Sequence, residues 1–176
     1  TLDNQPAHMR QVLLAAAKHQ GISLIEILQN CVIFNDQTWK DVAGPEVRGE
    51  RLLYLEKGKP LTYGTQVRKG IRSQQGRLEA VTLGEHGVTE QDLLVHDPEH
   101  DDPTKALQLA QLAYPEMPTP VGIFRSVKRP CFEAELEAQI KRNTARLGRR
   151  NLLSLLRGSG YWEITGSGAK IEMTQG

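Results

Sequence analysis

The hydrophobic pattern opens with a helical period. Between Met9 and Ala17, apolar side chains recur at intervals of three and four residues. Pro6 suits the first turn of a helix, and Gly21 suits the position just after its end. The sequence therefore predicts a helix that begins near Pro6 and closes before Gly21.

The following run, Ile22–Leu28, is short, apolar and rich in β-branched residues. That composition predicts a strand buried on both faces, as in a parallel sheet. A helix, a short turn and a buried strand form the second half of a β-α-β crossover. One parallel strand cannot make a sheet, so we expect the chain to be cut from a larger α/β domain or completed by another chain.

The pattern changes between Asn35 and Gly84. Two apolar runs, Arg51–Glu56 and Leu61–Tyr63, flank the turn-forming segment Lys57–Pro60 and predict a β-hairpin. Further strands are predicted at Leu78–Leu83 and at Leu93–Val95. This part of the chain is thus expected to be a small antiparallel region.

The rest of the chain predicts mainly helices. A helix is expected to start at Asp102-Pro103 and to stop before Tyr114-Pro115, and an extended segment covers Val121–Arg125. Two apolar helical segments follow, Phe132–Leu147 and Leu152–Leu156. The Gly- and Ser-rich residues from Gly158 onward are expected to form a loosely held tail.

Composition limits the class of protein. The 176 residues carry 22 Lys and Arg against 21 Asp and Glu, and 39% are hydrophobic, which indicates a soluble globular protein. We expect no membrane span, because no apolar run reaches about 18 residues. No secretory signal is visible in the first 20 residues. Two cysteines exclude a disulfide scaffold, so a reducing, cytoplasmic compartment is expected.

Charge is unevenly distributed along this nearly neutral chain. Segment 85–116 holds eight carboxylates against one lysine, whereas segment 128–157 holds eight Lys and Arg against three Glu. A solvated face or a subunit contact is the favoured interpretation of the basic segment, because its leucines need a cover. Nucleic-acid binding is disfavoured by the near-neutral total.

Cys31 is the most informative single residue. It follows the predicted buried strand, and ligands of open α/β sheets gather beyond the carboxyl ends of the strands. Three interpretations remain open: a buried packing thiol, a metal or cluster ligand, and a nucleophile, although no His base is close in sequence. The pair His96 and His100 superficially resembles a metal site, but Pro98 and Pro103 favour a solvated acidic turn.

Three segments carry a family resemblance: Ala16–Gly21, Ile25–Cys31 and Phe34–Asp36. They resemble the thiamine-diphosphate-binding β subunit of 2-oxoacid:ferredoxin oxidoreductases, more narrowly the 2-oxoglutarate type. Supporting segments, similar to the C-terminal extension of that subunit, are Leu61–Gly64, Val121–Arg125 and Gln139-Ile140. The resemblance reaches about Leu156 and covers only the C-terminal half of such a subunit.

The resemblance implies a fold and a division of the chain. Residues 1–40 would be the last helix–strand unit of a doubly wound, mainly parallel α/β domain that binds thiamine diphosphate. Residues 41–157 would be a mixed α+β C-terminal extension for subunit contacts, and residues 158–176 a flexible tail.

The resemblance also implies cofactors. Cys31 matches the fourth cysteine ligand of a four-iron four-sulfur cluster, whose other three ligands must lie outside this chain. The family's Cys-x-x-Cys, its Gly-Asp-Gly diphosphate motif and its Mg²⁺-binding Asn region are absent here. Thiamine diphosphate and Mg²⁺ would therefore bind mainly to the missing half. Cys131 replaces an aromatic residue of the family and is interpreted as packing.

The implied reaction is the oxidative decarboxylation of a 2-oxoacid to an acyl-CoA, with electrons passed to ferredoxin. The implied partners are the N-terminal half of the β subunit, an α subunit, ferredoxin, the 2-oxoacid and coenzyme A. We expect no catalytic residue in this chain and no activity of it alone. The basic segment, including Arg142, Arg146 and Arg149, would face the acidic ferredoxin. The alternatives are a non-catalytic assembly domain and the same enzyme type acting on pyruvate.

Overall fold

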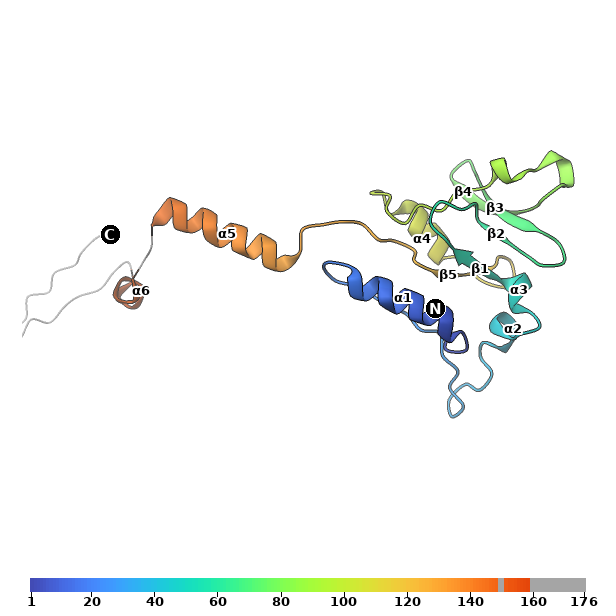
Figure 1. Ribbon diagram of the computed structural model, residues 1–176, viewed down its shortest axis with the longest axis horizontal. Coiled ribbons are helices and arrows are strands. Elements are labelled where there is room, and N and C mark those ends of the chain that lie inside the picture. The colour runs from blue at the N-terminus through green and yellow to red at the C-terminus, as the bar shows by residue number, and fades with distance from the viewer. Residues whose placement is uncertain (149–150, 159–176) are drawn as a thin grey trace, which may run out of the picture. The chain divides into compact units, whose positions relative to one another are not determined.

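The computed structural model describes residues 1–148 and 151–158. The chain forms two compact units, one covering Thr1–Arg129 and a second beginning at Pro130. The first is a mixed α/β unit with a two-stranded parallel sheet and a three-stranded antiparallel sheet (Figure 1). No helix among the described residues is long and apolar enough to cross a membrane.

Helix α1 spans Pro6–Lys18, which confirms the first prediction. It is flanked by a single parallel bridge between Leu2 and Leu28. The Leu28 N–H donates to the Thr1 carbonyl at 2.8 Å, and the Asp3 N–H donates to the Leu28 carbonyl at 3.1 Å. Two parallel extended segments connected by a helix are the arrangement of a β-α-β unit.

The strand predicted at Ile22–Leu28 is not formed. Apart from the bridge at Leu28, the segment makes no strand, and Ile22 and Leu24 are 95% and 98% exposed. A strand that is apolar on both faces is stable only between neighbouring strands and under helices. In the described part of the chain, the only backbone that pairs with this segment is that of residues 1–3.

The parallel sheet joins segments far apart in sequence. Strand β1, Leu52–Leu55, pairs with β5, Thr119–Gly122, with Tyr54 opposite Val121. Two short helices precede it, α2 at Lys40–Ala43 and α3 at Arg48–Arg51. Leu52 packs into one core cluster, with Leu2, Val42, Ala43 and Val121.

The next residue of β1 serves a second core. Leu53 is fully buried in a cluster with Leu55, Leu61, Ile71 and Leu109. Successive side chains of a strand point to opposite faces, so β1 separates the two cores and is covered on both sides. The two clusters therefore depend on one strand.

The antiparallel sheet differs from the predicted hairpin. Its strands are β2 at Thr62-Tyr63, β3 at Lys69–Gln74 and β4 at Arg77–Thr82, in the order β2-β3-β4. The hairpin prediction is wrong because β1 pairs with β5, while the expected turn pairs elsewhere. The Gly58 N–H donates to the His96 carbonyl, and the His96 N–H donates to the Lys59 carbonyl.

Strand β4 confirms the strand predicted at Leu78–Leu83 to within one residue, whereas β3 was not predicted. The predicted strand Leu93–Val95 is reduced to one bridge, between Val95 and Pro60. Leu93 instead packs over β3, where a Cβ added at Gly70 would lie only 2.4 Å from a Leu93 methyl. Short 3-10 turns at Glu85–Gly87 and Glu90–Asp92 connect these parts.

The predicted helices of the second half are present. Helix α4 spans Thr104–Ala110, so it ends earlier than the expected stop at Tyr114-Pro115. Helix α5 spans Phe132–Leu147 and α6 spans Leu152–Arg157, both as predicted. Of the predicted tail at 158–176, all but Gly158 lies outside the described residues.

Candidate functional site

Cys31 lies in the loop between α1 and α2, three residues after the Leu2–Leu28 bridge (Figure 1). An antiparallel bridge between Cys31 and Asn35 closes a tight turn, in which the Asn35 N–H donates to the Cys31 carbonyl at 2.9 Å. The thiol is free and exposed, so the packing interpretation does not hold in this structure.

Backbone N–H groups of the turn affect the acidity of the thiol. Hydrogen bonds from Phe34 first, then from Ile33 and Asn35, lower the pKa of the Cys31 thiol below its usual 9.0. They stabilise the thiolate because each N–H directs a positive partial charge at the sulfur. The turn therefore favours the form of cysteine that binds metals.

Asn30 braces this turn with both ends of its side chain. Its Nδ2 donates to Asp36 Oδ1 at 3.0 Å, and its Oδ1 accepts from the Gln37 N–H at 2.8 Å. Its own backbone N–H donates to Asp3 Oδ2 at 3.0 Å, which fastens the turn to the start of α1. Gln37 adopts a φ of 60°, a conformation that the hydrogen bond to Asn30 helps to hold.

Three apolar side chains form the tip of the same turn. Val32, Ile33 and Phe34 are all exposed, Phe34 by 89%. Exposed apolar side chains beside a low-pKa thiol are a suitable cover for a buried cofactor, because they would exclude water from it. This turn is the strongest candidate site in the chain.

Cys31 by itself can supply one soft ligand. No group of three or more potential metal ligands lies together among the residues that the structure describes. A thiolate that accepts backbone N–H bonds fits one corner of an iron–sulfur cluster, whose sulfur ligands typically accept such bonds. The chemistry of the turn therefore fits a ligand set shared with residues elsewhere.

The acidic turn at His96–Asp102 has a structural role. His96 is only 3% exposed, with Nε2 2.8 Å from the Ile123 carbonyl, so the expectation of a solvated turn is wrong for this residue. The two histidines belong to no potential ligand group in the described residues. The local hydrogen bonds explain the burial of His96 without a metal.

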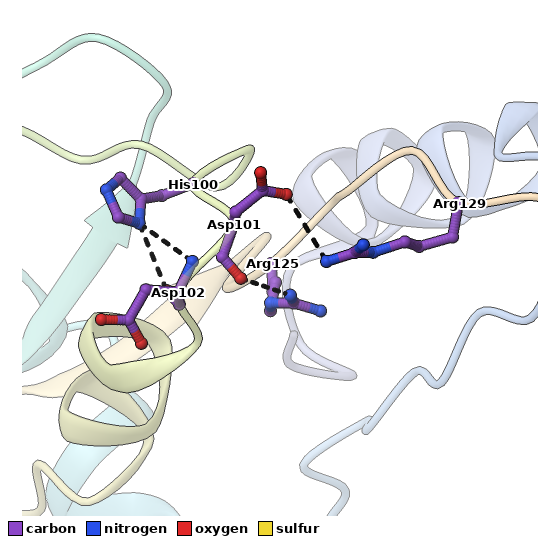
Figure 2. Close-up of polar contacts among 5 residues, drawn as sticks. All are labelled: His100, Asp101, Asp102, Arg125 and Arg129. Atoms are coloured by element: carbon purple, nitrogen blue, oxygen red, sulfur yellow. Dashed lines mark hydrogen bonds and ion pairs between the residues drawn. The ribbon is translucent and has the colours of Figure 1, made fainter.

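The acidic turn also neutralises basic side chains that follow β5. Figure 2 shows Asp101 between two arginines: its carbonyl accepts from Arg125 Nη2 at 2.9 Å, and its Oδ1 lies 3.5 Å from Arg129 Nη2. Asp102 donates its N–H to His100 Nδ1 at 3.2 Å. Part of the predicted basic surface is thus paired inside the first unit.

Three further basic side chains of this segment lie on α5 in the second unit. Lys141, Arg142 and Arg146 are exposed on α5, while Arg149 and Arg150 lie outside the described residues. Cys131 is half-buried at the N-terminal end of α5, where its carbonyl accepts the Glu135 N–H.

Sequence reasoning missed Asp3, Asn30 and Asp36 as the residues that shape the turn. A signal was present, because Asn and Asp flank Cys31 on both sides and readily bond to nearby backbone groups. The pairing of Asn30 with residues six and seven positions away depends on a turn that periodicity does not reveal.

Comparison with known proteins tests the family assignment. No protein-family model and no solved structure matches the chain. The chain is 34% identical over 166 residues to the 2-oxoglutarate oxidoreductase subunit KorB of Mycobacterium tuberculosis. The match covers 93% of this chain and 44% of that subunit, so the chain spans less than half the length of its relative. The resemblance seen in the sequence is thereby confirmed: the chain is homologous to part of the KorB subunit of 2-oxoglutarate oxidoreductase.

Proposed function

We propose that this chain is the C-terminal half of the β subunit of a 2-oxoglutarate:ferredoxin oxidoreductase. The proposal rests on the homology together with the chemistry of one thiol. The homology to KorB extends over 93% of the chain, and the one exposed thiol with a lowered pKa lies where the family resemblance puts a cluster ligand.

The proposed reaction oxidises and decarboxylates a 2-oxoacid in the presence of coenzyme A. Carbon dioxide leaves, the acyl group passes to the coenzyme A thiol, and a pair of electrons is delivered singly to oxidised ferredoxin. Thiamine diphosphate with Mg²⁺ belongs in this proposal to the half of the subunit that this chain lacks. The 2-oxoacid is proposed to be 2-oxoglutarate because the relative is named for it.

Within that reaction, the role of this chain is to hold an electron-transfer group. A four-iron four-sulfur cluster, when bound, supplies transfer of one electron at a time. Cys31 is proposed as one of its ligands. The N–H groups of Ile33–Asn35 would offset the negative charge on the Cys31 sulfur, and Val32 and Phe34 would keep water away.

The proposed organisation divides the chain at residue 40. Residues 1–40 end the doubly wound domain, with the exposed segment 22–28 becoming a strand between neighbours supplied by the other half. Residues 41–157 form the extension that contacts the other half and an α subunit. The exposed side chains of Ile22 and Leu24 support this arrangement, because burying their apolar surface against another chain would be favourable in free energy.

The test replaces Cys31 in the assembled enzyme. Cys31→Ser substitutes a hard, poorly acidic hydroxyl for a soft thiolate, so the purified complex should lose most of its iron and acid-labile sulfide. Cys131→Ser is the matched control, since it removes the other thiol of the chain and should leave the iron content unchanged. Bound thiamine diphosphate should be retained in both variants. Full iron occupancy in Cys31→Ser would contradict the assignment of Cys31 as a cluster ligand.

A second measurement addresses the alternative of a non-catalytic assembly domain. The tagged chain should co-purify with polypeptides that carry the missing cysteines and the diphosphate motif, identified by mass spectrometry. Recovery of a well-folded complex without iron, sulfide or thiamine diphosphate would favour the assembly domain instead.

A further inference from the structure

Helix α5 presents an unusual apolar stripe to solvent. Phe132, Leu136, Ile140 and Leu147 are between 42% and 74% exposed, and α5 has no buried residue. At about 100° per residue, these four side chains fall within about 80° of the helix circumference. A stripe of this width on a 16-residue helix is typical of a surface that packs against another helix.

Charge is divided along the same helix. Its three acidic residues, Glu133, Glu135 and Glu137, all lie in the first half, and its three basic residues all lie in the second half: Lys141, Arg142 and Arg146. The two halves meet at the ion pair between Glu137 and Lys141, 3.8 Å apart. Such a helix is complementary in charge to itself when the second copy runs in the opposite direction.

We propose that α5 forms an antiparallel pair with α5 of a second copy of this chain, around a twofold axis near Ile140. In this register Ile140 meets its own counterpart, and Phe132 faces Leu147 of the second copy. Leu136 faces Asn143, a polar residue in the stripe that disfavours other registers.

The flank of the stripe supplies matched ion pairs in this arrangement. A twofold axis brings the same flank of both helices together, and Glu135, Arg142 and Arg146 lie on one flank at about 100° per residue. Glu135 of each copy therefore lies beside Arg142 and Arg146 of the other. The twofold symmetry gives this ionic contact twice, once toward each end of the helix pair.

The same charges disfavour other occupants. An acidic protein on this stripe would meet Glu133 and Glu135 in the first half of the helix, and a basic one would meet Arg142 and Arg146 in the second. A parallel copy would place like charges opposite one another along the whole helix. The inference uses no property of Cys31 and goes beyond the proposed reaction.

Cross-linking tests the geometry directly. In the full complex under mild oxidation, Ile140→Cys should give a disulfide-linked dimer in most of the protein, because side chains at the twofold axis meet themselves. Leu147→Cys, at the end of the stripe, should give several-fold less, and so should Lys141→Cys, on the far side of the helix from the stripe. Peptide mapping assigns each link, since Cys31 and Cys131 are also present.

Charge exchange tests the specificity of the pair. Glu135→Arg should lower the yield of the Ile140→Cys link several-fold, and adding Arg142→Glu with Arg146→Glu should restore it. Equal links at Ile140→Cys and Leu147→Cys would show a parallel pair and overturn the proposal. The absence of a link at Ile140→Cys would also overturn the proposal, and is the result expected if another subunit covers the stripe. A link whose yield does not respond to the charge changes would overturn it as well.

Discussion

At the scale of single residues, the chain uses short polar side chains to hold backbone in fixed turns. Asn30 connects Asp36 and Gln37 across the Cys31 turn, with distances of 3.0 and 2.8 Å. Glu50 does the same for the loop after β2: its Oε1 accepts from the Thr65 N–H and hydroxyl, both at 2.6 Å, and from the Gln66 N–H at 2.9 Å. In both places one side chain bonds to backbone N–H groups that are not paired in a helix or a sheet.

Glu50 gives a prediction about pH. The hydrogen bond from the Thr65 hydroxyl, followed by those from the Gln66 and Thr65 N–H groups, lowers the pKa of the Glu50 carboxyl below its usual 4.5. The unfolded chain therefore binds the proton more tightly than the folded chain, and the contribution of Glu50 to stability is lost as pH falls below about 4.5.

The measurement compares melting temperature between pH 6 and pH 3 in the wild type and in Glu50→Gln. The difference between them should be largest at pH 6 and shrink toward pH 3, because protonation makes Glu50 resemble the amide. Glu46→Gln serves as the control, since it removes a carboxylate that lies outside the hydrogen bonds of that loop. A difference that does not change with pH would contradict the role given to the carboxylate.

At the scale of elements, β1 is the centre of the first unit. Leu52 faces the core that includes Val42, and Leu53 faces the core that includes Ile71. Helix α1 contacts the same strand through an edge-to-face pair of His8 and Tyr54, with ring centroids 5.4 Å apart. Both cores and α1 therefore depend on four residues of one strand.

This dependence predicts a large effect of a small change. Leu53→Ala, at a fully buried position, should lower the free energy of unfolding by about 2–5 kcal/mol, because it opens a cavity between β1, β3 and α4. Leu107→Ala, on the exposed side of α4, should change it by less than about 0.5 kcal/mol. Urea denaturation of the two variants measures the difference, and equal midpoints would show that β1 is not central to the core.

At the scale of the whole molecule, two of the exposed apolar regions among the described residues bear on assembly. One is the segment that contains Ile22 and Leu24 together with the turn tip at Val32–Phe34, and the other is the stripe on α5. Exposed patches of this kind mark contacts with other chains. The first patch is assigned here to the missing half of the subunit, and the second to another copy of this chain.

The first assignment predicts an assembly defect. Leu24→Glu puts a charge where a strand buried on both faces is proposed, so the chain should no longer co-purify with the other half of the subunit. Leu107→Glu changes another exposed leucine, outside that patch, and should co-purify normally. Quantitative pull-down measures both, and normal assembly of Leu24→Glu would contradict the proposed strand.

The sequence alone determined the features that depend on local pattern. The period of three and four residues predicted α1 and α5, Asp102-Pro103 predicted the start of α4, and the run Leu78–Leu83 predicted β4, because these signals depend on residues close together in sequence. The family assignment also came from local motifs, in particular the residues around Cys31, and the homology to KorB confirms it.

Only the tertiary structure decided which strands pair and which side chains meet. The parallel partner of Leu52 is Thr119, far along the chain, and a hairpin pattern cannot encode such a long-range choice. The polar strand β3 was missed because its stability comes from pairing with both neighbours rather than from its own composition. Segment 22–28 is the converse case: its composition specifies a strand buried on both faces, but such a strand needs neighbouring strands and covering helices that residues 1–3 alone do not supply.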